Sequence, residues 1–175
     1  MIQERRELRA RREPRTPSEL AEPSDHHRRL ATFVGSWRGE ELLHPSRALP
    51  GGGVTLGSFD YRMDVAGFFL LSSYQQRRGD PLALVLSGHG VYGWDPARGR
   101  YTMHWFDSQG GLAPQSPNHG TWDGDSLVFL RRSPRGFTRY IHTLEARDRY
   151  RFRMDGSHDG ERWSPLMEGR YARKG

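Results

Sequence analysis

Along most of the chain, apolar and polar residues alternate one by one instead of recurring at helical spacing. Phe59, Tyr61 and Met63 alternate with charged residues in one stretch, and over residues 149–154 three arginines alternate with a tyrosine, a phenylalanine and a methionine. A period of two places successive side chains on opposite faces of an extended chain. Each stretch therefore predicts a β-strand with one apolar face and one charged face.

Such stretches recur from Trp37 onward, and the segments between them are rich in glycine, proline and aspartate, the residues that tight turns require. No helical pattern of the length needed to cross between parallel strands separates them, which disfavours a parallel α/β fold. We predict an all-β fold, an antiparallel up-and-down β-barrel of about ten strands with the apolar faces inward. The predicted strands cover residues 37–44, 54–66, 68–78, 83–94, 100–107, 118–123, 126–132, 137–145, 149–156 and 162–172.

The N-terminal segment has a different composition. Glutamates and arginines nearly balance there, large apolar residues are scarce, and prolines interrupt any helix. We expect residues 1–24 to be a disordered charged tail, because they cannot bury enough surface to offset the entropy of ordering. A short N-terminal helix should follow, with Ser24 as its N-cap and Gly35 at its end, so that residues 25–175 form one barrel domain.

Composition narrows the class of protein. The 175 residues include no cysteine, which excludes disulfides, thiolate metal sites and cysteine nucleophiles. No apolar run is long enough for a membrane helix, and the first residues are charged rather than apolar. We expect a cytoplasmic protein with no membrane partner.

The net charge of +6 and the pI of about 10.1 raise the question of nucleic-acid binding. The arginines are spread along the chain and often face acids, and Lys174 is the only lysine. This distribution indicates a solvated basic surface, and the preference for arginine is typical of GC-rich bacterial genomes. We expect no nucleic-acid partner.

The segment Phe33-Val34-Gly35-Ser36-Trp37 carries a family resemblance. It resembles the Gly-x-Trp motif that begins the first strand of lipocalins and fatty-acid-binding proteins, which share the calycin barrel. The resemblance implies that Trp37 closes one end of the barrel. It also implies that a basic residue of the last strand, Arg170 or Arg173, covers the indole ring through a cation–π contact.

The likeness extends through residues 28–173, where the elements of a large bacterial family of lipocalin-like domains of unknown function occur in the same order. That resemblance implies a calycin barrel of about ten strands with an internal cavity. It implies no agreed activity, so no catalytic residue is carried over. The segments are Gly93-Trp94-Asp95-Pro96, Tyr101, His104-Trp105-Phe106-Asp107-Ser108, Gly120, Trp122 and Ser157-His158-Asp159-Gly160-Glu161-Arg162-Trp163.

The histidines of the strands are candidates for metal or haem ligation. His89, His104, His119 and His142 lack the close spacing of a local metal clamp, so we predict no metal site. The nitrobindin-like barrels, which the chain resembles more distantly, bind haem through one histidine near the C-terminus. His142 in mid-strand is the better positional match and His158 lies in a turn. We expect no cofactor, with a haem-binding barrel as an alternative.

The apolar faces suggest the lining of a binding cavity. Aromatic rings with a few hydroxyl and imidazole groups are typical of a pocket for an amphipathic or aromatic ligand. Glycines inside strands, such as Gly57, Gly88 and Gly90, favour a cavity over a core filled with side chains. The predicted ligand-binding residues are Tyr61, Met63, Tyr74, His89, Met103, Trp105, Tyr140, His142 and Phe152, and Tyr101, Met154, Phe68 and Leu70 belong to the same inward sets.

Our leading hypothesis is a carrier, sensor or storage protein that binds a small apolar or aromatic metabolite. The alternative is an enzyme of bacterial secondary metabolism, a cyclase or isomerase that uses histidine or tyrosine in acid–base chemistry. No nucleophile elbow, phosphate loop or dinucleotide fingerprint is present. The sequence leaves a homodimer open. The candidate catalytic residues are His104, His142, Tyr61, Tyr140 and Asp107.

Overall fold

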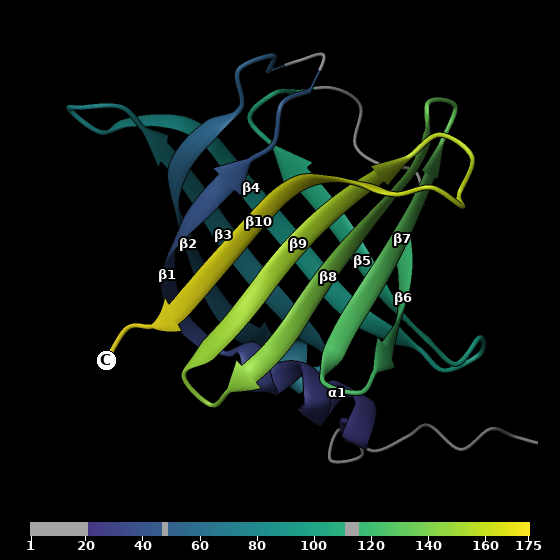
Figure 1. Ribbon diagram of the computed structural model, residues 1–175. Helices are drawn as coiled ribbons and strands as arrows, with labels where there is room; N and C mark the ends of the chain where they lie inside the picture. Colours follow the sequence, from purple (N-terminus) through teal and green to yellow (C-terminus); the bar gives the residue numbers. More distant parts are fainter. Residues whose placement is uncertain (1–20, 47–48, 111–115) are drawn as a thin grey trace, which may run out of the picture.

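The computed structural model describes residues 21–46, 49–110 and 116–175. Ten antiparallel strands form a closed barrel, and a short helix precedes them (Figure 1), which confirms the predicted all-β fold. The predicted tail over residues 1–24 lies outside the described residues except for its last four. The strands are β1 (Gly35–Leu43), β2 (Gly53–Asp64), β3 (Phe69–Arg78), β4 (Ala83–Asp95), β5 (Arg100–Asp107), β6 (Asn118–Asp123), β7 (Ser126–Ser133), β8 (Gly136–Ala146), β9 (Arg149–Ser157) and β10 (Ser164–Arg173).

Each strand pairs with its neighbours in the sequence, and β1 closes the sheet by pairing with both β2 and β10. Trp37 on β1 lies opposite Phe59 on one side and Arg173 on the other. The shortest ladder joins β5 to β6 through three residue pairs, from Tyr101 to Met103. Because the sheet closes on itself, the alternation along each strand separates an inner face from an outer face.

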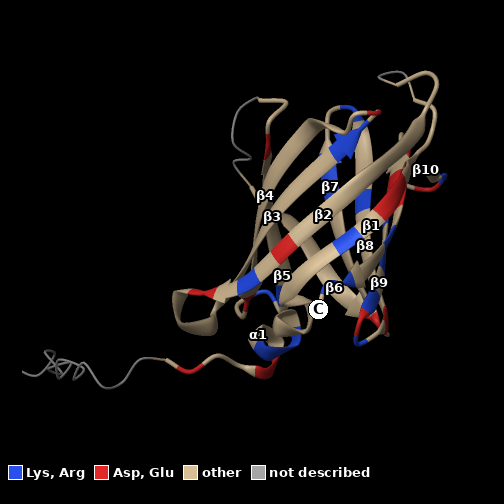
Figure 2. Ribbon diagram, turned by 90° about the vertical axis from the view of Figure 1, so that its left-hand side faces the viewer, with Lys and Arg blue, Asp and Glu red and all other residues tan. Residues whose placement is uncertain are grey.

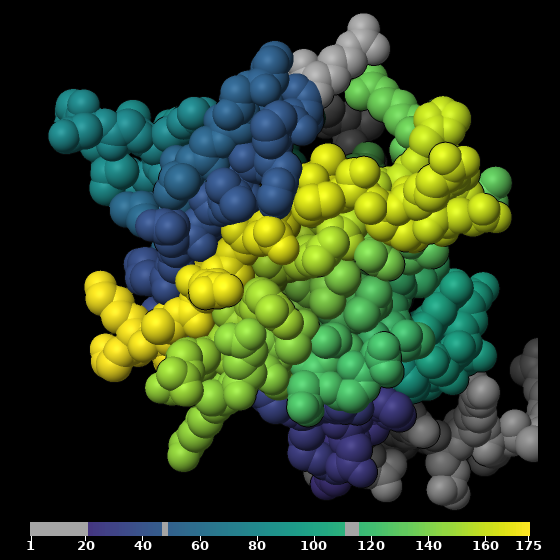
Figure 3. Space-filling model, viewed as in Figure 1, coloured from purple at the N-terminus to yellow at the C-terminus, as the bar shows by residue number. Residues whose placement is uncertain are grey.

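The N-terminal helix covers one end of the barrel, which we call the closed end. Helix α1 (Asp25–Leu30) runs into a 3₁₀ turn over residues 31–33, and Leu30 and Phe33 are buried at the end of the strands. Ser24 is the N-cap, and its backbone N–H donates to Nδ1 of His27 at 3.0 Å. Figure 3 shows the purple helix seated below the strands, so this end of the interior is not open to solvent on that face.

Trp37 fills the interior directly above the helix, as the Gly-x-Trp resemblance implies. Its side chain is fully buried, and its Nε1 donates to the carbonyl oxygen of Phe33 at 2.7 Å. The guanidinium carbon of Arg173 lies 4.2 Å from the centre of the indole ring, so Arg173 rather than Arg170 provides the cation–π cover. Arg173 also donates to the carbonyl oxygen of Val34, which joins the last strand to the segment before β1.

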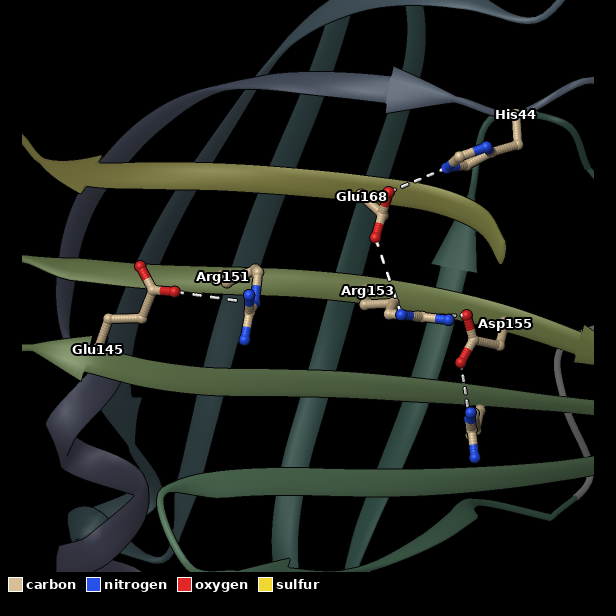
Figure 4. A network of polar contacts seen from close by, with 7 residues as sticks. His44, Glu145, Arg151, Arg153, Asp155 and Glu168 are labelled. Atoms are coloured by element: carbon tan, nitrogen blue, oxygen red, sulfur yellow. Dashed lines mark hydrogen bonds and ion pairs between the residues drawn. The ribbon is translucent and has the colours of Figure 1, made fainter. Parts of the chain in front are cut away.

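Acidic and basic residues are interspersed along the strands (Figure 2), and many of them point to the outer face. On one side they form a continuous network across β8, β9 and β10 (Figure 4). Asp155 is fully buried and accepts from Nε of Arg139 at 2.7 Å and from Nε of Arg153 at 2.6 Å. Glu168 lies 3.9 Å from Nη1 of Arg153 and 3.0 Å from Nε2 of His44. The buried carboxylate of the outer face, Asp155, is thus neutralised by two arginines.

Two glycines on β4 shape the interior. A Cβ atom at Gly88 would lie 2.3 Å from Cζ2 of Trp105, and one at Gly90 would lie 2.6 Å from Oγ of Ser72 and 2.8 Å from Cε2 of Tyr92. Real Cβ atoms do not approach other atoms so closely. The indole ring of Trp105 therefore lies in the space that a side chain at position 88 would occupy.

This contact gives a testable prediction about packing. Gly88→Ala should lower the free energy of unfolding by about 1–3 kcal/mol, because the new methyl group forces the indole ring of Trp105 to shift. Gly51→Ala is the matched control, since an added Cβ there meets no atom within 4 Å. Urea denaturation measures both values, and equal stability of the two variants would contradict the described position of Trp105.

Candidate functional site

The lower half of the barrel interior is filled by aromatic rings. The ring of Phe33 lies 5.9 Å from that of Tyr61 and 5.9 Å from that of Tyr150, and Tyr150 stacks on Tyr171 at 4.8 Å. All of these side chains are buried. The closed end is therefore a packed core, as small barrels commonly have.

The closed end also has half-buried inward side chains, namely Met63, Trp94, Trp122 and Leu144. The upper half of the interior lies between the middle of the strands and the opposite end. Several side chains there point inward by alternation and are only half-buried. Since they belong to the inner face of a closed sheet, their exposure means that solvent reaches the inside of the barrel. We call this region the upper chamber, and its half-buried lining consists of Leu43, Leu86, Trp105, Asp107, Asn118, Tyr140 and Met154.

Three aromatic rings form the floor of the upper chamber. Phe59 and Tyr74 are buried with ring centres 4.4 Å apart, and Trp105 lies 5.9 Å from Tyr74 and 6.5 Å from Phe59. The indole Nε1 donates to Oδ2 of Asp107 at 3.1 Å, which fixes the orientation of the ring. The floor thus presents a fixed aromatic surface to whatever enters the chamber.

A buried carboxylate lies beside this floor. Glu41 on β1 is fully buried and accepts hydrogen bonds from Oγ1 of Thr55 at 2.8 Å, from the hydroxyl of Tyr74 at 2.8 Å, from Nε2 of Gln76 at 2.8 Å and from the hydroxyl of Tyr171. The four donors come from β2, β3 and β10 and converge on a group that only accepts when it is ionised. The acceptor sites of Glu41 are thus used by neutral donors inside the barrel.

The same arrangement affects the tyrosines. Burial, reinforced by the negative charge of Glu41, raises the pKa of Tyr74 and of Tyr171 well above the usual value of a phenol. Both hydroxyls therefore keep their protons and serve as hydrogen-bond donors to Glu41 at any physiological pH.

His142 lies in the packed lower half. Its ring is surrounded by those of Phe33, Tyr92, Tyr150 and Phe152 at distances between centres of 5.0 to 6.3 Å. Burial lowers the pKa of His142 to about 4, so the imidazole is neutral at pH 7. A haem group would have to displace these rings to reach the imidazole, so the surroundings of His142 do not fit haem ligation.

Two buried hydroxyls just below the floor make no hydrogen bond to any other described residue. They belong to Tyr61 on β2 and Ser72 on β3, which lie opposite each other in the sheet. Burial raises the pKa of Tyr61 well above its usual value, so its hydroxyl stays protonated. Both groups retain hydrogen-bonding capacity inside the barrel.

The inner face holds most of the residues that the sequence analysis selected. Tyr74 and Trp105 belong to the floor of the upper chamber, and Asp107 and Tyr140 line its wall. Met63 lies near the closed end, opposite Leu70. The other selected residues that point inward are buried at or below the floor; they are Tyr61, Met103, His142 and Phe152.

Three residues that the sequence analysis selected for the interior or the site do not face the inside of the barrel. His89 is exposed on the outer face, because Gly88 and Gly90 take the inward positions on either side of it. His104 is also on the outer face, since Met103 and Trp105 point inward. Phe68 precedes β3 and packs against His27 beside the helix, with ring centres 4.9 Å apart.

Sequence reasoning missed Glu41 and its partners Thr55 and Gln76. A signal was present in the alternation of β1, because Trp37, Gly39 and Glu41 share one face. A charged residue on the same strand face as Trp37 must point into the barrel, unless the alternation of inward and outward residues is interrupted. The partners could not be identified, because they come from two other strands, β2 and β3.

Among the residues that the structure describes, no group of three or more histidine, aspartate or glutamate side chains could hold a metal ion. In the same part of the chain, no helix is long and apolar enough to cross a membrane.

A closed barrel of ten antiparallel strands, plugged at one end by a helix and a tryptophan, defines a lipocalin-like protein of the calycin type. The chain belongs to the DUF1579 family, described as a protein of unknown function, whose sequence profile matches residues 22–173. No curated protein has significant sequence similarity to it.

Solved structures share this fold at low sequence identity. Rv2717c from M. tuberculosis is 13% identical with a TM-score of 0.65, and the match covers 87% of this chain and 99% of that chain. The S-type phycobiliprotein lyase CPES from Guillardia theta is 10% identical with a TM-score of 0.56, covering 86% and 93%. A DUF3598 protein of unknown function from Nostoc punctiforme is 13% identical with a TM-score of 0.50, covering 83% and 49%. These likenesses show the fold alone.

Glu41 gives a prediction about stability. Glu41→Ala should lower the free energy of unfolding by about 3–5 kcal/mol, because the donors that converge on the carboxylate lose their acceptor inside the barrel. Glu145→Ala is the control, since Glu145 is half-exposed on the outer face, and the expected change is within about 0.5 kcal/mol. Urea denaturation of both variants tests this, and a small effect of Glu41→Ala would show that the carboxylate is not the acceptor of these bonds.

His142 gives a prediction about pH. Its pKa is about 4 in the folded protein and near the ordinary value of 6.5 in the unfolded chain, so the unfolded chain binds more protons as the pH falls from 6.5 to 4. Stability is lost over that window, by about 3 kcal/mol from this residue. His142→Gln should lack this part of the loss, whereas His89→Gln on the outer face should retain it. Urea denaturation at pH 7 and pH 4 measures the difference, and equal losses in all three proteins would refute the assignment.

Proposed function

We propose that this protein binds a small apolar or aromatic molecule in the upper chamber of the barrel. The observation that carries the proposal is the partial exposure of side chains that point inward from a closed sheet, such as Trp105, Tyr140 and Met154. The lining is mainly apolar and aromatic with a few polar groups, which is the usual composition of a ligand pocket.

The fold is shared with a phycobiliprotein lyase. This supports a role for the barrel interior by analogy only, because one fold serves many functions. The proposed role is that of a carrier, sensor or storage protein for the bound molecule. A cytoplasmic location, a homodimer and the absence of a nucleic-acid partner stay predictions.

The catalytic alternative has less support from the geometry. His104 lies on the outer face, and His142 and Tyr61 are buried with pKa values shifted away from neutrality. Asp107 and Tyr140 remain as ionisable candidates that line the upper chamber. A general acid or base needs a pKa near the working pH and direct access to the substrate, so the arrangement favours binding over acid–base catalysis.

Binding can be tested with N-phenyl-1-naphthylamine, a neutral aromatic probe whose fluorescence rises in apolar surroundings. We expect one probe molecule to bind per chain. Met154→Trp should weaken binding at least about tenfold, or about 1.4 kcal/mol, because the larger side chain fills the chamber. Leu130→Trp is the matched control, since Leu130 is exposed and should leave the affinity unchanged.

Fluorescence titration of the three proteins measures the affinities, and circular dichroism checks that both variants fold. No binding to the unaltered protein would contradict the proposal. Equal affinities for the two variants would place the probe outside the upper chamber and contradict it as well.

A further inference from the structure

The charge inside the barrel has the opposite sign to the charge of the whole chain. The chain carries a net charge of +6, whereas the middle of the inner face carries one carboxylate, Glu41, and the neutral His142. A second inward carboxylate, Asp107, is the last residue of β5 and lies near the mouth. No arginine or lysine of the described strands points inward within this middle region. The interior is therefore acidic within a basic protein.

The inward cations lie at the ends of the barrel. At the mouth, Arg131 on β7 is exposed, and Arg78 on β3 donates to the carbonyl oxygen of Gly52. At the closed end, Arg173 covers Trp37 from below. None of these three residues contacts Glu41 in the structure. Glu41 thus receives hydrogen bonds from neutral groups and has no described cation beside it.

The neighbours of Glu41 have the chemistry to hold a cation. Tyr74 donates to Glu41, and its ring belongs to the same floor as Phe59 and Trp105. The face of an aromatic ring attracts a cation, and tryptophan attracts it most strongly of the three ring types. Trp105 is half-buried, so its ring is accessible from the chamber. A positive group on the floor would experience both the rings and the nearby carboxylate.

Hydrogen-bond acceptors are available next to the floor. The hydroxyl of Tyr61 is one inward position deeper than Phe59, with ring centres 5.3 Å apart, and the hydroxyl of Ser72 is one inward position deeper than Tyr74. Both side chains are more than nine-tenths buried and make no hydrogen bond to any other described residue. Both oxygens lie beside the hydroxyl of Tyr92, so they add polar groups just below the aromatic floor.

We propose that the ligand of the upper chamber is a cation, an aromatic or apolar molecule that carries a protonated amine or another positively charged nitrogen. The nitrogen lies on the floor of Phe59, Tyr74 and Trp105, beside Glu41, and the apolar part occupies the chamber above. This inference rests on the proposed function and adds the sign of the ligand's charge. A barrel that binds a ligand with a carboxylate would instead need arginines that point inward to bind it.

The test uses three naphthalenes of equal size and different charge: 2-naphthylmethylammonium, 2-naphthylmethanol and 2-naphthoate. Isothermal titration calorimetry at pH 7.5 with the full chain measures each affinity. We expect the ammonium to bind at least about tenfold more tightly than the carboxylate, with the alcohol between them, because one carboxylate near the floor attracts the first and repels the last.

Glu41→Gln should reduce the affinity for the ammonium about tenfold and leave the affinity for the alcohol within about twofold. Glu145→Gln removes the same charge from the outer face and should change neither value. If Glu41→Gln fails to fold, Asp107→Asn replaces it, since Asp107 is half-buried near the mouth, and the expected loss for the ammonium is about threefold.

The outcomes separate the two proposals. Equal or tighter binding of 2-naphthoate overturns the inference about charge and leaves the proposed function standing. An ammonium preference that survives unchanged in Glu41→Gln, or in Asp107→Asn where that variant is used, also overturns the inference. The absence of binding by all three compounds overturns the proposed function and the inference together.

Discussion

The barrel has an enclosed interior because β1 pairs with two strands, β2 and β10, and so closes the sheet. Its hydrogen bonds to β2 and β10 remove both edges of the sheet, and each strand then has one face that points into the barrel. Trp37 lies on this closing strand and is held by Phe33 from the helix and by Arg173 from the last strand. The closure of the sheet and the plug at the closed end are thus one connected set of contacts.

Closure also explains why the two halves of the interior differ. The helix brings Phe33 among the rings of β2, β6, β8 and β9, and this supplies the volume that fills the lower half. The described residues at the mouth include no corresponding helix, so the inward side chains there are not covered in the same way. Gly88 and Gly90 leave room on the inner face of β4 that Trp105, Ser72 and Tyr92 occupy. The position of the chamber therefore follows from which end the N-terminal segment covers.

The fold could be predicted from the sequence because alternation, turn residues and the Gly-x-Trp motif all depend on local sequence. All ten strands were placed to within about two residues of their observed ends. The site was harder, because the direction of a histidine on a strand follows from register. His89 and His104 were expected to act at the site, although the apolar neighbours of His104 already implied that it faces outward. Glu41 was missed because a single charge among apolar residues is commonly a solvated one.

The two buried carboxylates of the barrel show how the sign of its interior is set. Asp155 on the outer face is neutralised by two arginines that reach it across neighbouring strands. Glu41 on the inner face receives neutral donors instead, because the inward positions around it hold Thr55, Tyr74, Gln76 and Tyr171. An arginine at any of these positions would cancel the charge. The basic outer surface does little to offset it, since water screens the exposed arginines more strongly than it screens a buried carboxylate. The sign of the interior is therefore decided by the four donors around Glu41 rather than by the net charge of the protein.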